Sequence, residues 1–164
     1  MTGIDMCWLA LVGISATALM DLWSLILKGL GMATPNYALL GRWVGHMRHG
    51  QFMHTRIASS PVIAAERSWG WALHYAIGIA FACLLVAILG PDWLRQPSWQ
   101  PALALGLLTV VLPLGIMQPA MGAGFASRKT AAPLRSCARS LCNHAVFGLG
   151  LYLGAQLVAL LRVQ

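Results

Sequence analysis

The chain has 164 residues, of which 59% are hydrophobic and 9% are charged, and its net charge is +7. Soluble domains carry about a quarter charged residues, so this composition excludes an ordinary soluble globular domain. Four apolar runs of 20 to 22 residues are each long enough to cross a hydrocarbon core of about 30 Å. They predict an all-α membrane protein, a bundle of four transmembrane helices forming one integral membrane domain over 1–164, with helices at 6–27, 70–89, 101–122 and 141–161.

The first run carries Asp21, one of only four acidic residues in the chain. It shares one helical face with small and polar residues at i, i+4, i+8, i+11 and i+15, namely Gly13, Thr17, Asp21, Ser24 and Lys28. A carboxylate that faces lipid at the bilayer centre costs about 2.5–3.5 kcal/mol on insertion scales. We therefore expect Asp21 to face the interior of the bundle.

The segment 28–69 and the segment 123–140 hold nine of the eleven Lys and Arg residues. The positive-inside rule therefore predicts that both are cytoplasmic loops and that both termini lie on the other side. The net charge is explained by this topology and by attraction to anionic lipid headgroups, which with the bilayer are the expected partners. Nucleic acid is not an expected partner, because no basic face remains unexplained.

The first loop contains a predicted amphipathic helix at the membrane interface. Thr34 is a candidate N-cap and Pro35 fits the first helical position. Apolar residues then recur at helical spacing, at Tyr37, Leu40, Val44 and Met47. Such a helix lies in the interface plane, and the residues expected to contact lipid headgroups are Arg42, Trp43, His46 and Arg48.

Five His and Met residues gather within nine positions of this loop, at His46, Met47, His49, Met53 and His54. Such ligands suit copper(I), but the arginines around them would repel a cation. Contact with lipid phosphate is the favoured interpretation, and histidines there would respond to pH near neutrality.

The second and fourth apolar runs repeat a motif. One reads "HYAIGIAF" from His74 and the other "HAVFGLGLY" from His144, each with a glycine four residues after the histidine. The runs before them carry "LMD" ending at Asp21 and "IMQ" ending at Gln118. The chain is therefore predicted to form two parallel helical hairpins, an arrangement that commonly places a site at the repeat interface.

One polar residue of each predicted helix lies 5 to 10 residues from the nearest cytoplasmic charge, which is roughly 7–15 Å along a helix. We call these four residues the polar layer: Asp21, His74, Gln118 and His144. With Ser24 and Thr17, they are the candidates for a ligand site or proton pathway.

Several interpretations of the polar layer stay open. It could be a buried hydrogen-bond network that fixes helix register, or a proton or small-solute pathway in which Pro113 and Pro119 kink the third helix beside Gln118. His74, His144 and Asp21 would suit a metal, and the two histidines could ligate a haem, although no cofactor is favoured. An enzyme is not favoured, because no nucleophile motif is present. A transporter this short usually oligomerises, so a homo-oligomer is compatible with the pathway.

Five segments together are typical of one family: "ALMDLWSLILK", "NYALLGRWVGHM", "HYAIGIAFA", "IMQPAMGAG" and "NHAVFGLGLY". In these, and in their order over nearly the whole chain, the sequence resembles an uncharacterised family of small four-helix bacterial inner-membrane proteins, a domain of unknown function. The resemblance implies a multipass protein of the inner (cytoplasmic) membrane, with both termini then periplasmic. It implies no activity.

Overall fold

The computed structural model describes residues 3–162, and these are mainly helical, with no β-strand among them. The predicted all-α class is therefore confirmed. The helices are α1 (Gly3–Gly29), α2 (Tyr37–Met47), α3 (Glu66–Leu89), α4 (Trp99–Thr109), the π-helix η3 (Pro113–Met117), α5 (Gln118–Ala120) and α6 (Pro133–Arg162). Single 3₁₀ turns lie at η1 (Ile57–Ser59), η2 (Pro91–Leu94) and η4 (Phe125–Ser127).

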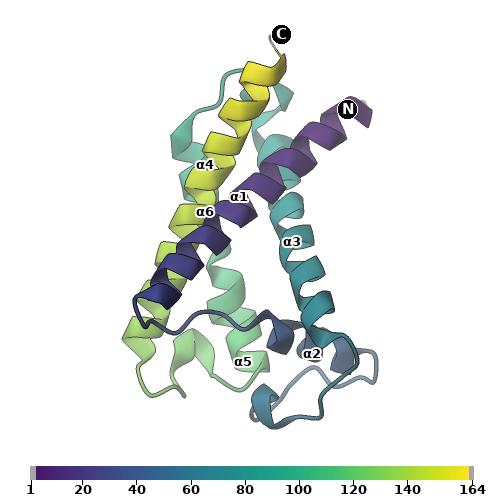
Figure 1. The fold of residues 1–164 in the computed structure, drawn as a ribbon, viewed down its shortest axis with the longest axis vertical. Helices are drawn as coiled ribbons and strands as arrows, with labels where there is room; N and C mark the ends of the chain where they lie inside the picture. The colour runs from purple at the N-terminus through teal and green to yellow at the C-terminus, as the bar shows by residue number, and fades with distance from the viewer. Residues whose placement is uncertain (1–2, 163–164) are drawn as a thin grey trace. The chain divides into compact units, whose positions relative to one another are not determined.

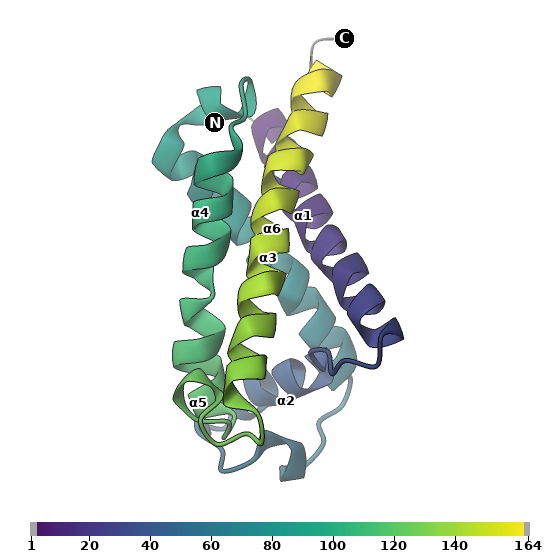
Figure 2. The same ribbon diagram turned by 90° about the vertical axis from the view of Figure 1, so that its left-hand side faces the viewer.

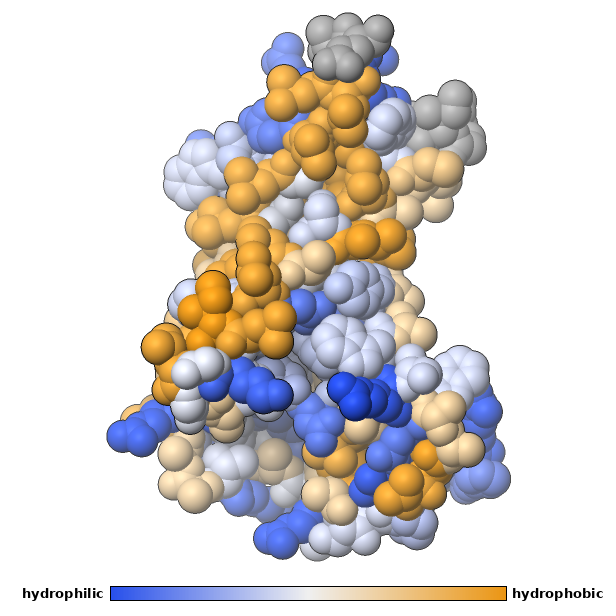
Figure 3. All heavy atoms as spheres, viewed as in Figure 1, coloured by the Kyte–Doolittle hydropathy of each residue, from blue (hydrophilic) through white to orange (hydrophobic). Residues whose placement is uncertain are grey.

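Four helical segments are long and apolar enough to cross a membrane: Met6–Gly29, Glu66–Leu89, Trp99–Ala120 and Pro133–Arg162. Between 28% and 39% of the most apolar stretch of each is buried inside the protein. Most of their apolar side chains therefore face outward, and Figure 3 shows such side chains gathered over the outer surfaces of α1 and α6. This is the pattern expected of helices whose solvent is lipid rather than water.

Contacts divide the chain into two compact units. The first comprises Met1–Thr34, Tyr75–Leu108 and Asn143–Gln164, and the second comprises Pro35–His74 and Thr109–Cys142. Each unit draws on separate parts of the chain, so no single cut in the sequence separates them.

Glycines join the helices of the first unit in the pairs that the sequence repeat predicts. A Cβ added at Gly78 of α3 would overlap the Thr17 hydroxyl of α1, and one added at Gly13 would lie 2.5 Å from the Ile79 Cα. In the second pair, a Cβ at Gly106 of α4 would lie 2.6 Å from the Gly148 Cα of α6. The glycine of each His-x-x-x-Gly motif therefore packs on the preceding helix of its own hairpin, as small residues do in membrane bundles.

The two hairpins of the first unit meet where α1 crosses α6, and the crossing is visible in Figure 1. A Cβ at Gly150 would lie 2.7 Å from the Ala16 Cα, so the helix axes approach closely there. Figure 2 shows α4 running beside α6. The apolar core between these helices includes Leu9, Val12, Leu151 and Val158, all buried.

The third membrane segment is interrupted, as the two prolines predict. Pro113 has no N–H to donate, so the helix shifts to i→i−5 hydrogen bonding, and the Gln118 N–H donates to the Pro113 carbonyl. This π-helix ends directly before Gln118, where α5 begins.

Two local expectations about helix starts are wrong. The N-cap of α2 is Asn36, whose side chain accepts from the Ala38 N–H at 3.1 Å, so neither Thr34 nor Pro35 has the expected position. The last helix begins at Pro133 rather than near residue 141, so Arg135 and Arg139 lie in its first turns and not in a loop. Proline is favourable at the first position of a helix, which suits a start at Pro133. Packing of α6 against its neighbours also favours this earlier start.

Candidate functional site

Asp21 lies on α1 in the first unit, and its partner across the helix pair is a tyrosine. The Tyr75 hydroxyl of α3 donates a hydrogen bond to the Asp21 carboxylate. Both residues lie within segments able to cross a membrane. Acidic groups within membrane helices are typically paired with other protein groups in this way.

Thr17 and Ser24, which share one face of α1 with Asp21, lie near it. Thr17 is 1% exposed, and its hydroxyl donates to the Gly13 carbonyl at 2.8 Å. Ser24 lies three residues after Asp21, on the same helical face, and its Oγ is buried without a hydrogen-bond partner among the described residues. A buried hydroxyl left this way usually marks the place of an ordered water or a ligand.

His74 belongs to the second unit, where aromatic rings cover it. The His74 and Tyr37 rings stack at 4.0 Å between centroids, with 22° between their planes, and the Trp71 ring lies 5.9 Å away. The side chain is 9% exposed. This aromatic cluster joins the start of α2 to the first turns of α3.

Gln118 lies in the same unit, where its side chain is bound by the segment 123–140. Its Oε1 accepts from the Ser127 hydroxyl at 2.6 Å, and the Ser127 and Ser136 hydroxyls lie 2.7 Å apart. Ser127 is 1% exposed and has φ 59°, a strained conformation for a residue with a side chain. Strain of this kind persists only where surrounding contacts enforce it.

The polar layer divides between the two units, with Asp21 and His144 in the first and His74 and Gln118 in the second. In the first unit, the His144 main-chain carbonyl lies against Gly106 of α4. In the second, His74 and Gln118 have different partners. Convergence of all four residues on one ligand stays a prediction.

The described residues contain no group of three or more His, Cys, Asp or Glu side chains placed to hold a metal ion. The structure therefore gives no support to a metal site made from His74, His144 and Asp21. A haem held by the two histidines stays a prediction.

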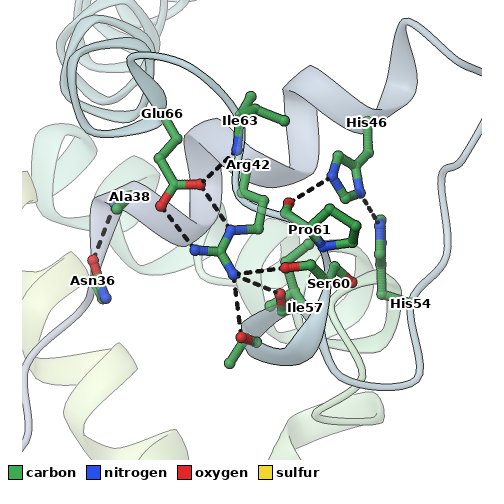
Figure 4. Close-up of polar contacts among 11 residues, drawn as sticks. Asn36, Ala38, Arg42, His46, His54, Ile57, Ser60, Pro61, Ile63 and Glu66 are labelled. Carbon is green, nitrogen blue, oxygen red and sulfur yellow. Dashed lines mark hydrogen bonds and ion pairs between the residues drawn. The ribbon is translucent and has the colours of Figure 1, made fainter.

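Arg42 is the centre of the second unit rather than a lipid contact. Its Nε and Nη2 donate to the two carboxylate oxygens of Glu66, each at 2.8 Å, and Figure 4 shows this paired geometry. Its Nη1 lies 3.1–3.3 Å from three main-chain carbonyls, those of Ile57, Ala58 and Ser60. The hydrogen bonds to Glu66 raise the pKa of Arg42 above its ordinary value, while burial opposes them.

The fold around this ion pair explains its position. Glu66 begins α3, where a negative charge is favourable, and it reaches back to accept from the Ile63 N–H at 3.3 Å. A Cβ at Gly41 of α2 would overlap the Glu66 carbonyl, so α2 lies directly against the start of α3. The arginine side chain is only 9% exposed, which differs from the expected contact with lipid headgroups.

His46 is also internal to the second unit. Its Nδ1 lies 2.8 Å from the His54 Nε2, and its Nε2 lies 3.0 Å from the Pro61 carbonyl (Figure 4). Burial lowers the pKa of His54, the neighbouring His46 lowers it further, and the Ala120 carbonyl acts in the opposite direction. The two rings form a buried pair and not the exposed phosphate-binding cluster that we expected from the sequence.

Trp43 and Arg48 are the other two residues expected at the lipid interface. The Trp43 Nε1 donates to the Phe52 carbonyl at 2.8 Å, and the Arg48 guanidinium lies 5.1 Å from the centre of the Trp69 ring. Arg48 is exposed and Trp43 is half-buried. Their contact with lipid stays a prediction.

Sequence reasoning missed Tyr75, Glu66 and Ser127. Two of them had a usable signal: Glu66 is the one acid in a loop with five basic residues, and Tyr75 directly follows His74 in an apolar run. Ser127 had no such signal, because its role depends on a turn with positive φ, which no residue pattern predicts.

Comparison with curated proteins and with solved structures finds no significant match. A family model described as "Protein of unknown function (DUF2938)" matches residues 10–158, which include all of α2 to α5, most of α1 and most of α6. The sequence-based resemblance to an uncharacterised family is thereby confirmed. The chain belongs to the DUF2938 family of proteins of unknown function.

Proposed function

We propose that this protein is a transport or permeation component of a membrane, in which the Asp21 carboxyl group binds a proton or a small cation. The observation that carries the proposal is the Asp21–Tyr75 hydrogen bond between two helices able to cross a membrane, with the buried Ser24 hydroxyl one turn away. Ionisable groups within membrane helices are costly to retain and typically mark ion pathways or proton relays.

The chemistry of the three groups suits a cation rather than an anion. A carboxylate and two hydroxyls offer oxygen atoms only, which are the ligands that protons and hard cations take. The close α1–α3 approach at Gly13 and Gly78 holds the two helices in one register beside these groups. A site on packed helices keeps its geometry better than one on a loop.

Proteoliposomes containing the purified protein and a pH-sensitive dye test this proposal. An imposed proton or potassium gradient should collapse faster with wild-type protein than with Asp21→Asn, whose neutral amide cannot exchange a proton. Asp92→Asn is the matched control, because Asp92 is 88% exposed in an i,i+3 ion pair with Arg95. Tyr75→Phe should give an intermediate rate.

A thermal melt of each variant separates transport from a purely structural role. The proposal fails if Asp21→Asn lowers the melting temperature while its flux per folded molecule equals that of the wild type. That outcome would favour a buried network that only fixes helix register.

A further inference from the structure

An open polar depression of about 500 Å³ lies in the second unit, on the segment from Gln51 to Ser60. Seven residues line it: Gln51, Met53, His54, Thr55, Arg56, Ser59 and Ser60. All but the methionine are polar, one is positively charged, and none is acidic. The depression is distinct from the Asp21 site, which belongs to the first unit.

The polar side chains of this depression are not used to hold the fold. The side chains of Gln51, Thr55, Arg56, Ser59 and Ser60 make no hydrogen bond or ion pair with other residues in the described part of the chain. Their backbone, in contrast, is fixed. Arg42 binds the Ala58 and Ser60 carbonyls, and a Cβ at Gly122 would overlap the Thr55 carbonyl, so the segment cannot shift freely.

His54 adds a buried group that lacks a partner. The Pro61 carbonyl can only accept, so the His46 Nε2 carries a hydrogen and its Nδ1 accepts from the His54 Nε2 when both rings are neutral. The His54 Nδ1 is buried and has no hydrogen-bond partner among the described residues. The side chain is 7% exposed and lines the depression.

We propose that this depression binds a phosphate group, either as free phosphate or as the headgroup of a phospholipid. The Arg56 guanidinium would supply the charge and paired donors that match phosphate oxygens. The hydroxyls of Thr55, Ser59 and Ser60 and the Gln51 amide would donate to the remaining oxygens.

The proposal concerns a second site and does not depend on the function proposed for Asp21. One feature favours phosphate over a cation or a neutral ligand: the one charged side chain of the lining, Arg56, is positive. Phe52 and Met53 are 56% and 65% exposed beside the depression. Apolar side chains in such a place are suited to contact acyl chains below a bound headgroup.

Isothermal titration of the purified protein in a non-ionic detergent tests the proposal, with inorganic phosphate and a short-chain phosphatidic acid as separate probes. Arg56→Gln should weaken binding of the preferred probe about ten-fold or more, since a charge-assisted pair is lost. Ser59→Ala combined with Ser60→Ala should weaken it several-fold. Binding of phosphate alone would indicate a soluble ligand, and binding of the lipid alone a headgroup.

Arg67→Gln is the matched control, because Arg67 is an exposed arginine of the same basic segment outside the lining. Equal weakening by Arg56→Gln and Arg67→Gln would show diffuse attraction and overturn the proposal. So would the absence of binding of both probes at millimolar concentration to wild-type protein with a normal melting temperature. Asp21→Asn should bind the probe as the wild type does, which separates this test from that of the proposed function.

Discussion

Arg42 shows how one side chain can hold a whole segment of this protein. Its guanidinium makes two hydrogen bonds to the Glu66 carboxylate, and its Nη1 lies within hydrogen-bond distance of three carbonyls, those of Ile57, Ala58 and Ser60. Hydrogen bonds to a charged donor are each stronger than neutral ones, and a planar guanidinium is already arranged to make several together. Ile57 is buried and its N–H donates to the Met121 carbonyl at 3.0 Å, so Arg42 adds to contacts that already hold this segment.

Replacing Arg42 with Gln should therefore lower the free energy of unfolding by about 2–4 kcal/mol, because Glu66 would remain partly buried without its counter-charge. Denaturant titration in detergent, followed by tryptophan fluorescence, measures this. Arg95→Gln is the control, since the Arg95–Asp92 pair is 77% and 88% exposed and should contribute less than about 1 kcal/mol. Equal losses in the two variants would contradict the account of Arg42.

His54 predicts a pH dependence of stability. Its pKa in the folded protein is lowered, chiefly by burial, below the ordinary histidine value of about 6.5. Above that value the ring is neutral in both states and its contribution is full. As pH falls below about 6.5, the unfolded chain takes up the proton first, so the folded state loses stability until the lowered pKa is reached.

Melting temperatures measured at a series of pH values should therefore fall less steeply below pH 6.5 in His54→Gln than in the wild type. His49→Gln, at an exposed histidine of the same segment, should leave the slope unchanged. If the two variants flatten the slope equally, the buried pair with His46 is not its source.

At the scale of elements, the contacts of the first unit are set by glycine. Gly78 and Gly148 occupy equivalent places in the two repeats, and each lets its helix pack directly on the preceding one. Hydrogen bonds and van der Waals contact must hold membrane helices together, because lipid gives them no hydrophobic drive to associate. The close contacts are therefore expected to be sensitive to any added side chain.

Gly78→Ala should destabilise the protein by about 1–3 kcal/mol, because its Cβ would overlap the Thr17 hydroxyl. Gly115→Ala is the matched control, since the nearest atoms to its Cβ would be 3.8 Å away. Resistance to unfolding in detergent compares the two. A tolerated Gly78→Ala together with a damaging Gly115→Ala would show that the helix pairing is wrong.

Element positions were predictable to the extent that they depend on hydropathy. The four apolar runs, the α2 helix and the break at Pro113 all follow from spacing and from proline chemistry. The early start of α6 was not predictable, because Arg135 and Arg139 read as loop residues when basic residues are used to mark loops. The first turns of a membrane helix tolerate basic side chains, because these side chains can extend toward the headgroups.

At the scale of the whole molecule, the sequence located polar groups but not their partners. Asp21, His74, Gln118 and His144 each lie on a helix, yet Tyr37, Tyr75 and Ser127 were needed to describe the surroundings of the first three. Pairing across helices depends on rotation and register, which residue spacing along one helix does not contain. The Arg42–Glu66 pair could not be predicted for the same reason, because the two residues are 24 positions apart in the sequence.

The proposed function rests on Asp21 as a carboxyl group that exchanges a proton or cation within the membrane. Infrared difference spectroscopy of the reconstituted protein, recorded between acidic and alkaline pH, tests this most directly. The account predicts a protonated-carboxyl band that Asp21→Asn abolishes and that Tyr75→Phe shifts, because the hydroxyl bound to the carboxyl is removed. A spectrum that Asp21→Asn leaves unchanged would contradict it.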